Sequence, residues 1–401
     1  MLRPRALPAI GRRQFLQHSG AALLGSTLAG CSVAVLSPQR RPAPAPALEL
    51  RPPHASADRI TNITVCTRPF RAQGPRLDVE QILGKTVVHN YGHGGSGWSL
   101  SWGSSAIAAE SALASGEREV AVIGCGAMGL TSALLLQRAG AKVRIYARDL
   151  PPNVHSSLAT GLWTPDSRIC FEEYAIPAFR QQWQRMARRS FAAYQTLLGL
   201  PGNPVEFIDV YFVSDGEKFS RALPPEDPRP RFAELQHELV GDLMTQSEAF
   251  PPGSHPLGAR WLQRSALMMF NLTAYTHLLL SDFRLGGGEI EVTEFHTPAE
   301  LARVREKTLI NATGYGARAL LGDQSVIPVR GQVARVIPEP QVSYGLLYNG
   351  VAFVPRRDGL VFQVIGANDY YGFNDDTTVP DRAEAERAVS TIAALFNAPR
   401  P

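Results

Sequence analysis

Hydrophobic and polar positions become regular only from about residue 58 onwards. Period-two patterns and short apolar runs predict strands over residues 58–66, 120–124, 142–146, 205–213, 289–293, 307–311, 326–337, 344–354 and 360–365. Helical spacing predicts helices over residues 104–113, 127–139, 171–199, 227–250, 271–285 and 381–397. The strands between 326 and 365 follow one another directly, so we expect an antiparallel sheet separate from the other strands.

A glycine motif stands between the strand at 120–124 and the helix at 127–139. Gly124-Cys-Gly126-Ala127-Met128-Gly129 has the spacing GxGxxG in its informative context, after a strand and at the start of a helix. The first glycine permits a tight turn, the second a close approach of the backbone to a pyrophosphate, and the third close packing of helix on strand. The unit therefore predicts a Rossmann-like dinucleotide-binding layer in an α/β protein.

The acidic residue expected after the next strand is less regular. That strand ends Tyr146-Ala147-Arg148-Asp149, and Asp149 can bind ribose hydroxyls. Arg148 instead favours a phosphate on that ribose, as in NADP. Both interpretations stay open on the residues alone.

Composition narrows the class of protein. The chain has 401 residues, of which 44% are hydrophobic and 19% charged, as in a soluble globular protein with a large core. Its net charge of +4 comes from four arginines within residues 1–30. The remainder is neutral, so nucleic acid is not an expected partner.

The N-terminus has the parts of a targeting signal. Residues 11–16 resemble a twin-arginine export signal, and a weakly apolar stretch follows at 21–29. Leu28-Ala-Gly-Cys31 resembles a lipoprotein cleavage box, which predicts a signal peptide over residues 1–30 and a lipid on Cys31. Residues 31–57 then form a Pro/Ala-rich tether. We expect a bacterial protein that is exported, periplasmic or membrane-anchored; the alternative is an ordinary soluble signal with an incidental cysteine.

The remaining cysteines give no metal site. Cys66, Cys125 and Cys170 lack CxxC or paired Cys/His spacing, so we expect no bound metal. Their odd number leaves at least one thiol free.

Three segments carry a resemblance to the D-amino-acid oxidase family. They are Val154-His-Ser-Ser-Leu-Ala-Thr-Gly-Leu-Trp-Thr-Pro165, Val88-His-Asn-Tyr-Gly-His-Gly-Gly-Ser-Gly97 and Thr67-Arg-Pro-Phe-Arg71. The glycine-rich loop at 88–97 is long and unusual, so its match is the most specific. Weaker similarity covers 311–314, 330–332 and 348–349, and the whole resemblance spans about residues 58–397.

The order of these segments differs from the family, in which GxGxxG begins the chain and the glycine loop ends it. The resemblance therefore implies a circular permutation. Residues 58–119 would be the displaced C-terminal part and 120–200 the FAD-binding core. Residues 201–325 would mix FAD-binding and substrate segments, and 326–401 would form the substrate-domain sheet and closing helix. The implied fold is a Rossmann-like FAD-binding domain with an antiparallel-sheet substrate domain.

The resemblance implies a reaction and two residues that hold its substrate. A D-amino acid or related amine would lose hydride to flavin N5, and the imino acid would hydrolyse to a keto acid and ammonia, with oxygen reduced to hydrogen peroxide. Arg68 would bind the substrate carboxylate, with Tyr348 assisting; a structural salt bridge and a packed strand tyrosine are the alternatives. Ala352 stands where the family has a second pocket tyrosine; the alternative is that Tyr370 or Tyr371 fills this place from a nearby loop.

The resemblance also implies a set of residues around FAD. Ser156 and Ser157 would bond the phosphates or the ribityl chain, and backbone amides of the glycine loop would face the flavin, while His89 and His93 are expected to be structural. Further cofactor-binding positions are Gly92, Gly94, Gly95, Ser96, Gly97, Trp98, Ser99, Thr160, Gly161, Leu162 and Val292.

Three rival functions remain open: a dehydrogenase of the same fold that uses a membrane electron acceptor, an NADP-linked reductase, and a flavin-binding protein with a decayed pocket.

Overall fold

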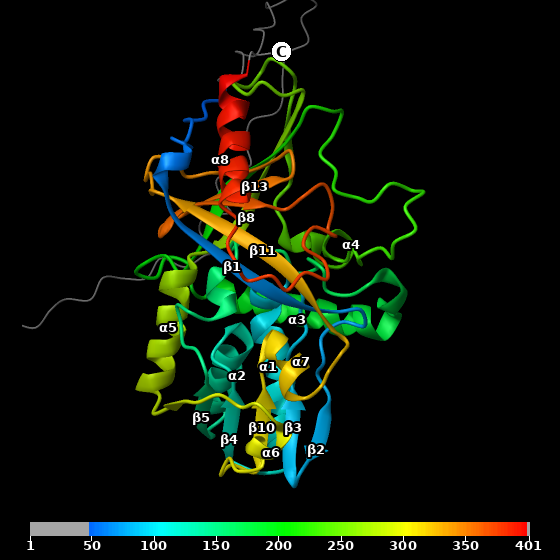
Figure 1. Cartoon of the computed structure of the whole chain (residues 1–401), viewed down its shortest axis with the longest axis vertical. Helices are drawn as coiled ribbons and strands as arrows, with labels where there is room; N and C mark the ends of the chain where they lie inside the picture. Colours follow the sequence, from blue (N-terminus) through cyan, green and yellow to red (C-terminus); the bar gives the residue numbers. More distant parts are fainter. Residues whose placement is uncertain (1–47, 399–401) are drawn as a thin grey trace, which may run out of the picture. The chain divides into compact units, whose positions relative to one another are not determined.

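The computed structural model describes residues 48–398 (Figure 1). The predicted signal peptide, Cys31 and the tether up to residue 47 lie outside the described residues. The last residues of the predicted tether contact the folded body: the His54 amide donates to Glu339 Oε1 at 3.0 Å, and Tyr344 donates to the Arg51 carbonyl at 2.6 Å.

A six-stranded sheet forms the nucleotide-binding layer. Its order is β2 (Val79–Ile82), β3 (Lys85–His89), β10 (Thr308–Asn311), β4 (Glu119–Ile123), β5 (Lys142–Ala147) and β9 (Glu289–Val292). All neighbouring pairs are parallel except β2–β3. The central strands are continuous apolar runs because helices cover both faces.

The two faces of this sheet carry different helices. One apolar core lies between the sheet and four helices, α1 (Gly97–Leu113), α2 (Ala127–Arg138), α3 (Pro177–Gln195) and α5 (Leu272–Leu285). On the other face, a smaller core includes residues of α6 (Pro298–Leu301) and α7 (Ala317–Leu320). The predicted α/β class with a Rossmann-like layer is confirmed.

An eight-stranded, mostly antiparallel sheet forms the second layer. Its order is β1 (Ile60–Arg71), β11 (Val326–Val336), β14 (Gly359–Val364), β13 (Val351–Arg356), β12 (Gly345–Tyr348), β6 (Val205–Ser214), β8 (Trp261–Phe270) and β7 (Glu248–Phe250). Only the β12–β6 pair is parallel. The long strands β1 and β11 lie side by side along their whole length (Figure 1), with Arg68 opposite Val329.

Helix α8 (Arg382–Asn397) covers one face of this second sheet. Ala388, Val389, Ile392 and Leu395 are buried in a core shared with strands β11, β13 and β14. The Asp381 side chain caps the helix by accepting from the amides of Ala383 and Glu384.

Several predicted elements differ from the observed ones. The helix predicted over 227–250 is wrong: α4 spans only Gln236–Val240, followed by a short 3-10 turn and β7. Pro228 and Pro230 cannot donate backbone hydrogen bonds, which disfavours a helix there. The strand predicted over 344–354 is a hairpin, because Asn349 and Gly350 form its turn with φ of 47° and 73°. Strand β8 was not predicted.

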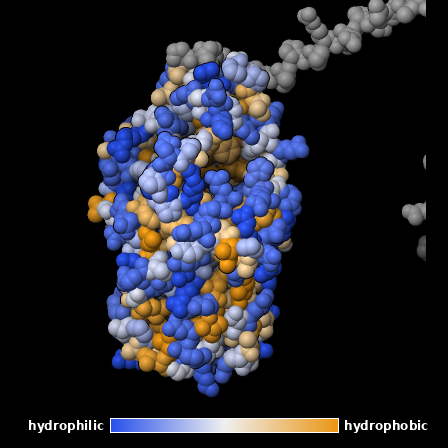
Figure 2. Space-filling view, turned by 90° about the vertical axis from the view of Figure 1, so that its right-hand side faces the viewer, coloured by the Kyte–Doolittle hydropathy of each residue, from blue (hydrophilic) through white to orange (hydrophobic). Residues whose placement is uncertain are grey.

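The surface of the described part of the chain is uneven in both shape and polarity. On the face shown in Figure 2, the surface is hollowed in the upper half, and apolar residues are more frequent in the lower half. Among residues 48–398, no helix combines the length and apolar character needed to cross a bilayer. Cys66, Cys125 and Cys170 are buried and free.

Candidate active site

The turn from β4 into α2 has the geometry that a dinucleotide motif requires. Gly124 has φ of +108°, and a Cβ there would lie 2.6 Å from the Ala312 carbonyl oxygen. A Cβ on Gly129 would lie 2.0 Å from the Gly124 carbonyl oxygen, so helix and strand touch there. Backbone contacts of this kind leave no room for a side chain, and the amides at the N-terminus of a helix are suited to an anion.

The segment at 154–158 lies against the N-termini of two helices. The Ala127 amide, at the start of α2, donates to Ser156 Oγ at 3.1 Å. Trp98, at the start of α1, donates from Nε1 to the Ser156 carbonyl at 2.7 Å. The N-terminus of α2 therefore directs positive potential at this segment, which suits a diphosphate.

Two buried polar atoms beside this segment have no partner in the described part of the chain. They are Ser157 Oγ and Trp163 Nε1. A buried donor without a partner is costly, and such groups call for a missing water, ion or ligand. A phosphate-rich, hydroxyl-rich cofactor supplies the acceptors that both groups lack, so the residues present fit FAD.

The glycine loop is fixed by its own backbone. The Gly94 amide donates to the Pro69 carbonyl at 2.8 Å, and the Gly95 amide donates to the Ser167 carbonyl at 2.9 Å. These two amides, expected to face the flavin, thus have protein partners. Ser96 Oγ donates to the Ser167 carbonyl as well. The loop therefore connects β1 to the segment at 167–168, and α1 begins directly after it at Gly97.

The other predicted positions of this region connect the same elements. Gly92 has φ of +89°. Ser99 Oγ accepts from the Thr164 amide at 2.8 Å.

The predicted positions at 160–162 contact the second sheet. Gly161 has φ of +97°, and its carbonyl accepts from the Phe270 amide at 2.7 Å. Leu162 pairs with Met269 of β8. Thr160 Oγ1 bonds to Gln363, so the segment after the serines reaches the second sheet.

Arg68 projects from β1 without a carboxylate partner. Its Nη1 donates to the Arg330 carbonyl at 3.0 Å, and the side chain is half-buried. Within residues 48–398, no carboxylate lies within ion-pair distance of it. A Cβ on Gly331 would lie 2.4 Å from Arg68 Nη2, so the guanidinium lies flat across that glycine. A half-buried arginine of this kind is suited to an anionic ligand.

Tyr348 ends β12 on the same sheet. Its hydroxyl donates to Asp215 Oδ2 at 3.0 Å. Burial and, to a smaller extent, this hydrogen bond raise the pKa of Tyr348 to about 12. The phenol is therefore protonated at any ordinary pH and keeps a proton to donate.

The region around Ala352 lacks the second pocket tyrosine. Ala352 is buried in β13, opposite Leu347 and Gln363. The hydroxyl of Tyr370 donates to the Pro230 carbonyl at 2.7 Å, so it already has a partner. Burial and the nearby charge of Glu384 raise the pKa of Tyr371 to about 12.

The comparison with known families decides the class of protein. A family model described as FAD dependent oxidoreductase matches residues 119–400. The chain belongs to this family. It is an enzyme of the FAD-dependent oxidoreductase class, and its cofactor is FAD.

Individual relatives of this oxidoreductase share modest identity. It is 28% identical over 282 residues to a D-amino-acid oxidase from Rubrobacter xylanophilus, covering 68% of this chain and 76% of that one. It is 26% identical over 285 residues to a D-amino-acid oxidase from Streptomyces coelicolor, covering 69% and 77%. The structure of iminodiacetate oxidase from Chelativorans sp. BNC1 aligns with a TM-score of 0.47 at 15% identity, covering 69% and 79%.

The residues predicted to bind the ribose follow β5, whose end pairs with the end of β9. Arg148 donates to Asp149 Oδ2 at 2.7 Å and to Glu294 Oε1 at 3.1 Å. Val292 ends β9 and is 66% exposed. Because two carboxylates already neutralise Arg148, it has no surplus charge for a ribose phosphate, and the NADP interpretation is not supported.

Sequence reasoning missed three residues of the oxidoreductase that gather near Arg68. They are Arg168, Arg221 and Asp369, joined by ion pairs of 3.2 Å from each arginine to Asp369 Oδ1. No motif marks them: Arg168 follows the matched segment at 154–165, and Arg221 lies in a proline-rich loop after β6. Only folding brings them together.

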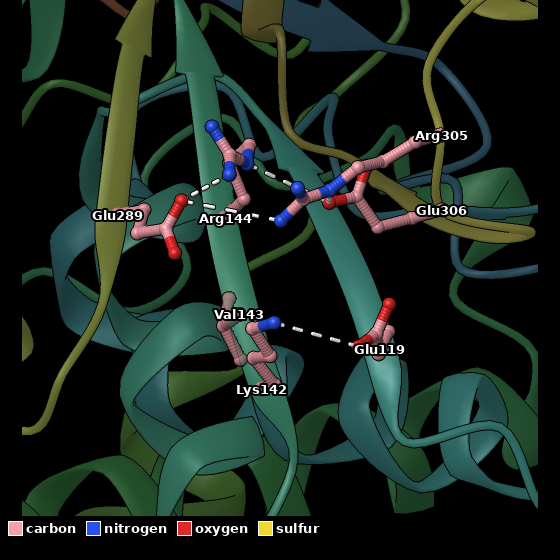
Figure 3. Close-up of a pocket in the computed structure, with 7 residues that line it drawn as sticks. All are labelled: Glu119, Lys142, Val143, Arg144, Glu289, Arg305 and Glu306. Carbon is pink, nitrogen blue, oxygen red and sulfur yellow. Dashed lines mark hydrogen bonds and ion pairs between the residues drawn. The ribbon is translucent and has the colours of Figure 1, made fainter.

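A groove that the sequence did not predict lies on the β5–β9 side of the six-stranded sheet. It has a volume of about 460 Å³, and Arg144, Tyr146, Phe295 and Arg303 are among its lining residues. A smaller pocket beside it is lined by opposite charges that face one another (Figure 3). Arg144 pairs there with Glu289, and Lys142 pairs with Glu119 at 3.5 Å. These pairs satisfy one another, so the smaller pocket is a solvated ion-pair surface.

Proposed function

We propose that this oxidoreductase oxidatively deaminates a D-amino acid, yielding a keto acid and ammonia and reducing oxygen to hydrogen peroxide. The observation that carries the proposal is Arg68: half-buried, free of any carboxylate partner in the described chain, and next to Pro69, whose carbonyl holds the glycine loop. The D-amino-acid oxidases among its relatives support the same substrate class.

The cofactor would be held by the glycine turn and by the segment at 154–158. The diphosphate would meet the amides of α2 after Gly126, and the unpartnered hydroxyl of Ser157 would bond it or the neighbouring hydroxyls. When bound there, FAD would supply the electron chemistry as the acceptor of the substrate's hydride. The chain itself needs no acid–base triad, since its task is orientation.

The substrate would be oriented from the eight-stranded sheet. Arg68 would pair with both carboxylate oxygens, which fixes the α-carbon in one position. Tyr348 would contribute its hydroxyl after exchanging its bond to Asp215. Only the neutral amine can give up hydride, so kcat/KM is expected to rise with pH. Tyr348 does not limit this rise because its pKa is about 12.

Turnover of matched enantiomers tests the proposal. Purified mature enzyme with FAD is given each D-amino acid and its L-enantiomer, and keto acid and hydrogen peroxide are measured separately. We expect the enzyme to form keto acid from the D-enantiomers alone. Keto acid without peroxide would identify a different electron acceptor, and product from L-enantiomers alone would overturn the stereochemistry.

We further propose that the chain is a circular permutant of its family. The family match begins at residue 119, yet residues 60–113 occupy central places in the fold. Strand β1 pairs with β11, β3 pairs with β10, and α1 packs against α2. A rearranged chain with residues 58–118 placed after 398 through a flexible linker tests this: it should bind FAD, and a rearranged chain that does not fold would contradict it.

We also propose export through the twin-arginine route and anchoring by a lipid on Cys31. The support is the sequence of residues 11–31, which lie outside the described residues. Twin-arginine export carries folded proteins, so FAD can be loaded beforehand. Cys31→Ala should release the enzyme from membranes, and unchanged membrane retention would rule out the anchor.

A further inference from the structure

Three arginines and one carboxylate gather at the substrate side of the candidate site. Asp369 Oδ1 lies 3.2 Å from Arg168 Nη2 and 3.2 Å from Arg221 Nη1. Arg68 has no carboxylate partner among residues 48–398. The group thus has three positive charges and one negative charge before any substrate binds.

Arg168 is the most constrained member. Its side chain is only 7% exposed, and its φ of +51° is in the left-handed region, which a bulky residue rarely adopts. Strain of this kind persists where the surroundings impose it, and it concentrates at functional sites. Nε donates to the Asp369 carbonyl at 2.6 Å. Burial lowers the pKa of Arg168 to about 9, and the charges of Arg68 and Arg221 act in the same direction.

The glycine loop joins Arg168 to Arg68. The Gly94 amide bonds to the Pro69 carbonyl, one residue after Arg68. A Cβ on Gly94 would lie 1.9 Å from the Arg168 carbonyl oxygen, so the two backbones touch. Arg168 therefore lies at the same loop as Arg68, and like-charge repulsion from Arg68 contributes to lowering the pKa of both other arginines.

Arg221 reaches the group from a different segment. Its Nη2 donates to the carbonyls of Ile365 at 2.7 Å and Asn368 at 3.1 Å. Its side chain is 22% exposed, so it remains accessible from solvent. Two buried or half-buried guanidiniums on one carboxylate leave a positive charge without a counterion, which a low-polarity environment penalises.

We propose that the site around Arg68 selects a D-amino acid whose side chain ends in a carboxylate. The inference rests on the proposed function. The α-carboxylate pairs with Arg68, and the side-chain carboxylate binds at Arg168 and Arg221, which supplies the missing negative charge. D-Aspartate and D-glutamate have this chemistry. Their amides, D-asparagine and D-glutamine, match them in shape and lack the charge.

The competing explanation is that Arg168 and Arg221 serve only to hold the loop at 365–369. Comparing each acid with its amide separates the two explanations, since a purely structural role gives no preference for charge. With the intact FAD enzyme, kcat/KM for D-aspartate should exceed that for D-asparagine by about 10- to 100-fold, as for a hydrogen bond to a charged group. Equal values, or a preference for the amide, would overturn the inference.

Arg221→Gln tests the residue assignment, because glutamine keeps an amide donor for the loop carbonyls and loses the charge. The ratio of kcat/KM for D-aspartate to that for D-asparagine should fall at least about tenfold. Arg229→Gln is the matched control: it removes a positive charge from the same loop, where Arg229 pairs with Asp227. Its ratio should equal that of the unchanged enzyme. A ratio unaffected by Arg221→Gln would contradict the assignment.

A binding measurement gives the same answer without turnover. Succinate and butyrate both have four carbons and differ by one carboxylate, and each can be titrated into the enzyme while the flavin spectrum is followed. Succinate should bind at least about tenfold more tightly. Equal affinities would overturn the inference. If no D-amino acid reduces the flavin while succinate still binds more tightly than butyrate, the proposed reaction fails and the dicarboxylate site stands.

Discussion

Arg68 and Gly331 form one unit across two strands. Arg68 stands opposite Val329 in the β1–β11 register, and its guanidinium extends diagonally over Gly331. Any side chain at residue 331 would occupy the space of the guanidinium. The glycine thus fixes where the positive charge lies, although Gly331 itself contacts no substrate in this account.

Both Arg68→Leu and Gly331→Ala should therefore weaken substrate binding, and Arg68→Leu should have the larger effect. Arg68→Leu removes the charge, so kcat/KM should fall by about 100-fold or more, as for the loss of a bidentate charged pair. Gly331→Ala only displaces the guanidinium, so KM should rise by about tenfold. Steady-state kinetics on both variants measures this.

Flavin content is the control for these two variants. Both should be purified with the yellow cofactor, because neither residue belongs to the phosphate-binding turn. Loss of the flavin from Arg68→Leu would show that Arg68 acts at the cofactor and would contradict its role in binding the carboxylate.

Sequence and structure differ most at the residue scale. Arg68 could be predicted because it lies in a recognisable segment, as do the glycines at 124–129. Arg168 and Arg221 could not, because their meeting depends on a left-handed backbone at Arg168 and on a loop without periodic pattern. The amides of Gly94 and Gly95 were expected to face the flavin, but the fold pairs them with Pro69 and Ser167.

At the scale of elements, the turn from β4 into α2 is the place where we propose that the cofactor's diphosphate binds. Helix α2 can begin there only because Gly129 allows it to touch the strand end. The amides at its N-terminus and the 154–158 segment then face one another. A change in the distance between α2 and β4 would therefore change the geometry of the proposed phosphate site.

Gly129→Ala should weaken FAD binding strongly. Its Cβ would lie 2.0 Å from a backbone oxygen, which cannot move aside like a flexible side chain. Overpacking of this kind costs about 1–3 kcal/mol and should shift α2. Fluorescence titration of apoprotein with FAD should show an affinity reduced by about 10- to 100-fold, in line with that cost.

Gly216→Ala provides the comparison. A Cβ at Gly216 meets only Ser214 Oγ at 3.5 Å, an ordinary contact on an exposed loop. This variant should bind FAD like the unchanged protein. If Gly129→Ala binds FAD equally well, the turn does not position the cofactor.

Elements with strong periodicity were predicted well. Helices α5 and α8 and strands β10 and β11 have nearly the expected bounds, because each buries one regular face or lies between apolar layers. Strand β8 was not predicted because its first three buried positions, Leu262, Ser265 and Met268, are three residues apart, which hides the period of two. Asn349–Gly350 is a hairpin-turn signal in the sequence, and this turn divides the strand predicted over residues 344–354 into β12 and β13.

At the scale of the whole molecule, buried histidines link stability to pH. His93 is fully buried with its Nε2 2.7 Å from Ser104 Oγ, and burial lowers its pKa to about 3. Burial also lowers the pKa values of His89 and His255. An unfolded histidine binds a proton below its ordinary pKa of about 6.5, whereas the folded one does not.

The free energy of unfolding should therefore fall as the pH is lowered below about 6.5. His93 alone contributes about 1.4 kcal/mol per pH unit, or about 2 kcal/mol between pH 6.5 and 5. Urea unfolding at pH 7 and pH 5, with equal FAD, measures the change. His93→Gln should reduce the slope, and the exposed-site variant His237→Gln should not. Equal stability at both pH values would contradict the prediction.

Anaerobic reduction of the bound flavin tests most directly whether the enzyme oxidises a D-amino acid at FAD. D- and L-amino acids are added singly to purified enzyme without oxygen, and the visible flavin band is followed. We expect D-amino acids to bleach the band and their L-enantiomers to leave it unchanged. A flavin band bleached only by L-enantiomers, or by no amino acid, would contradict it.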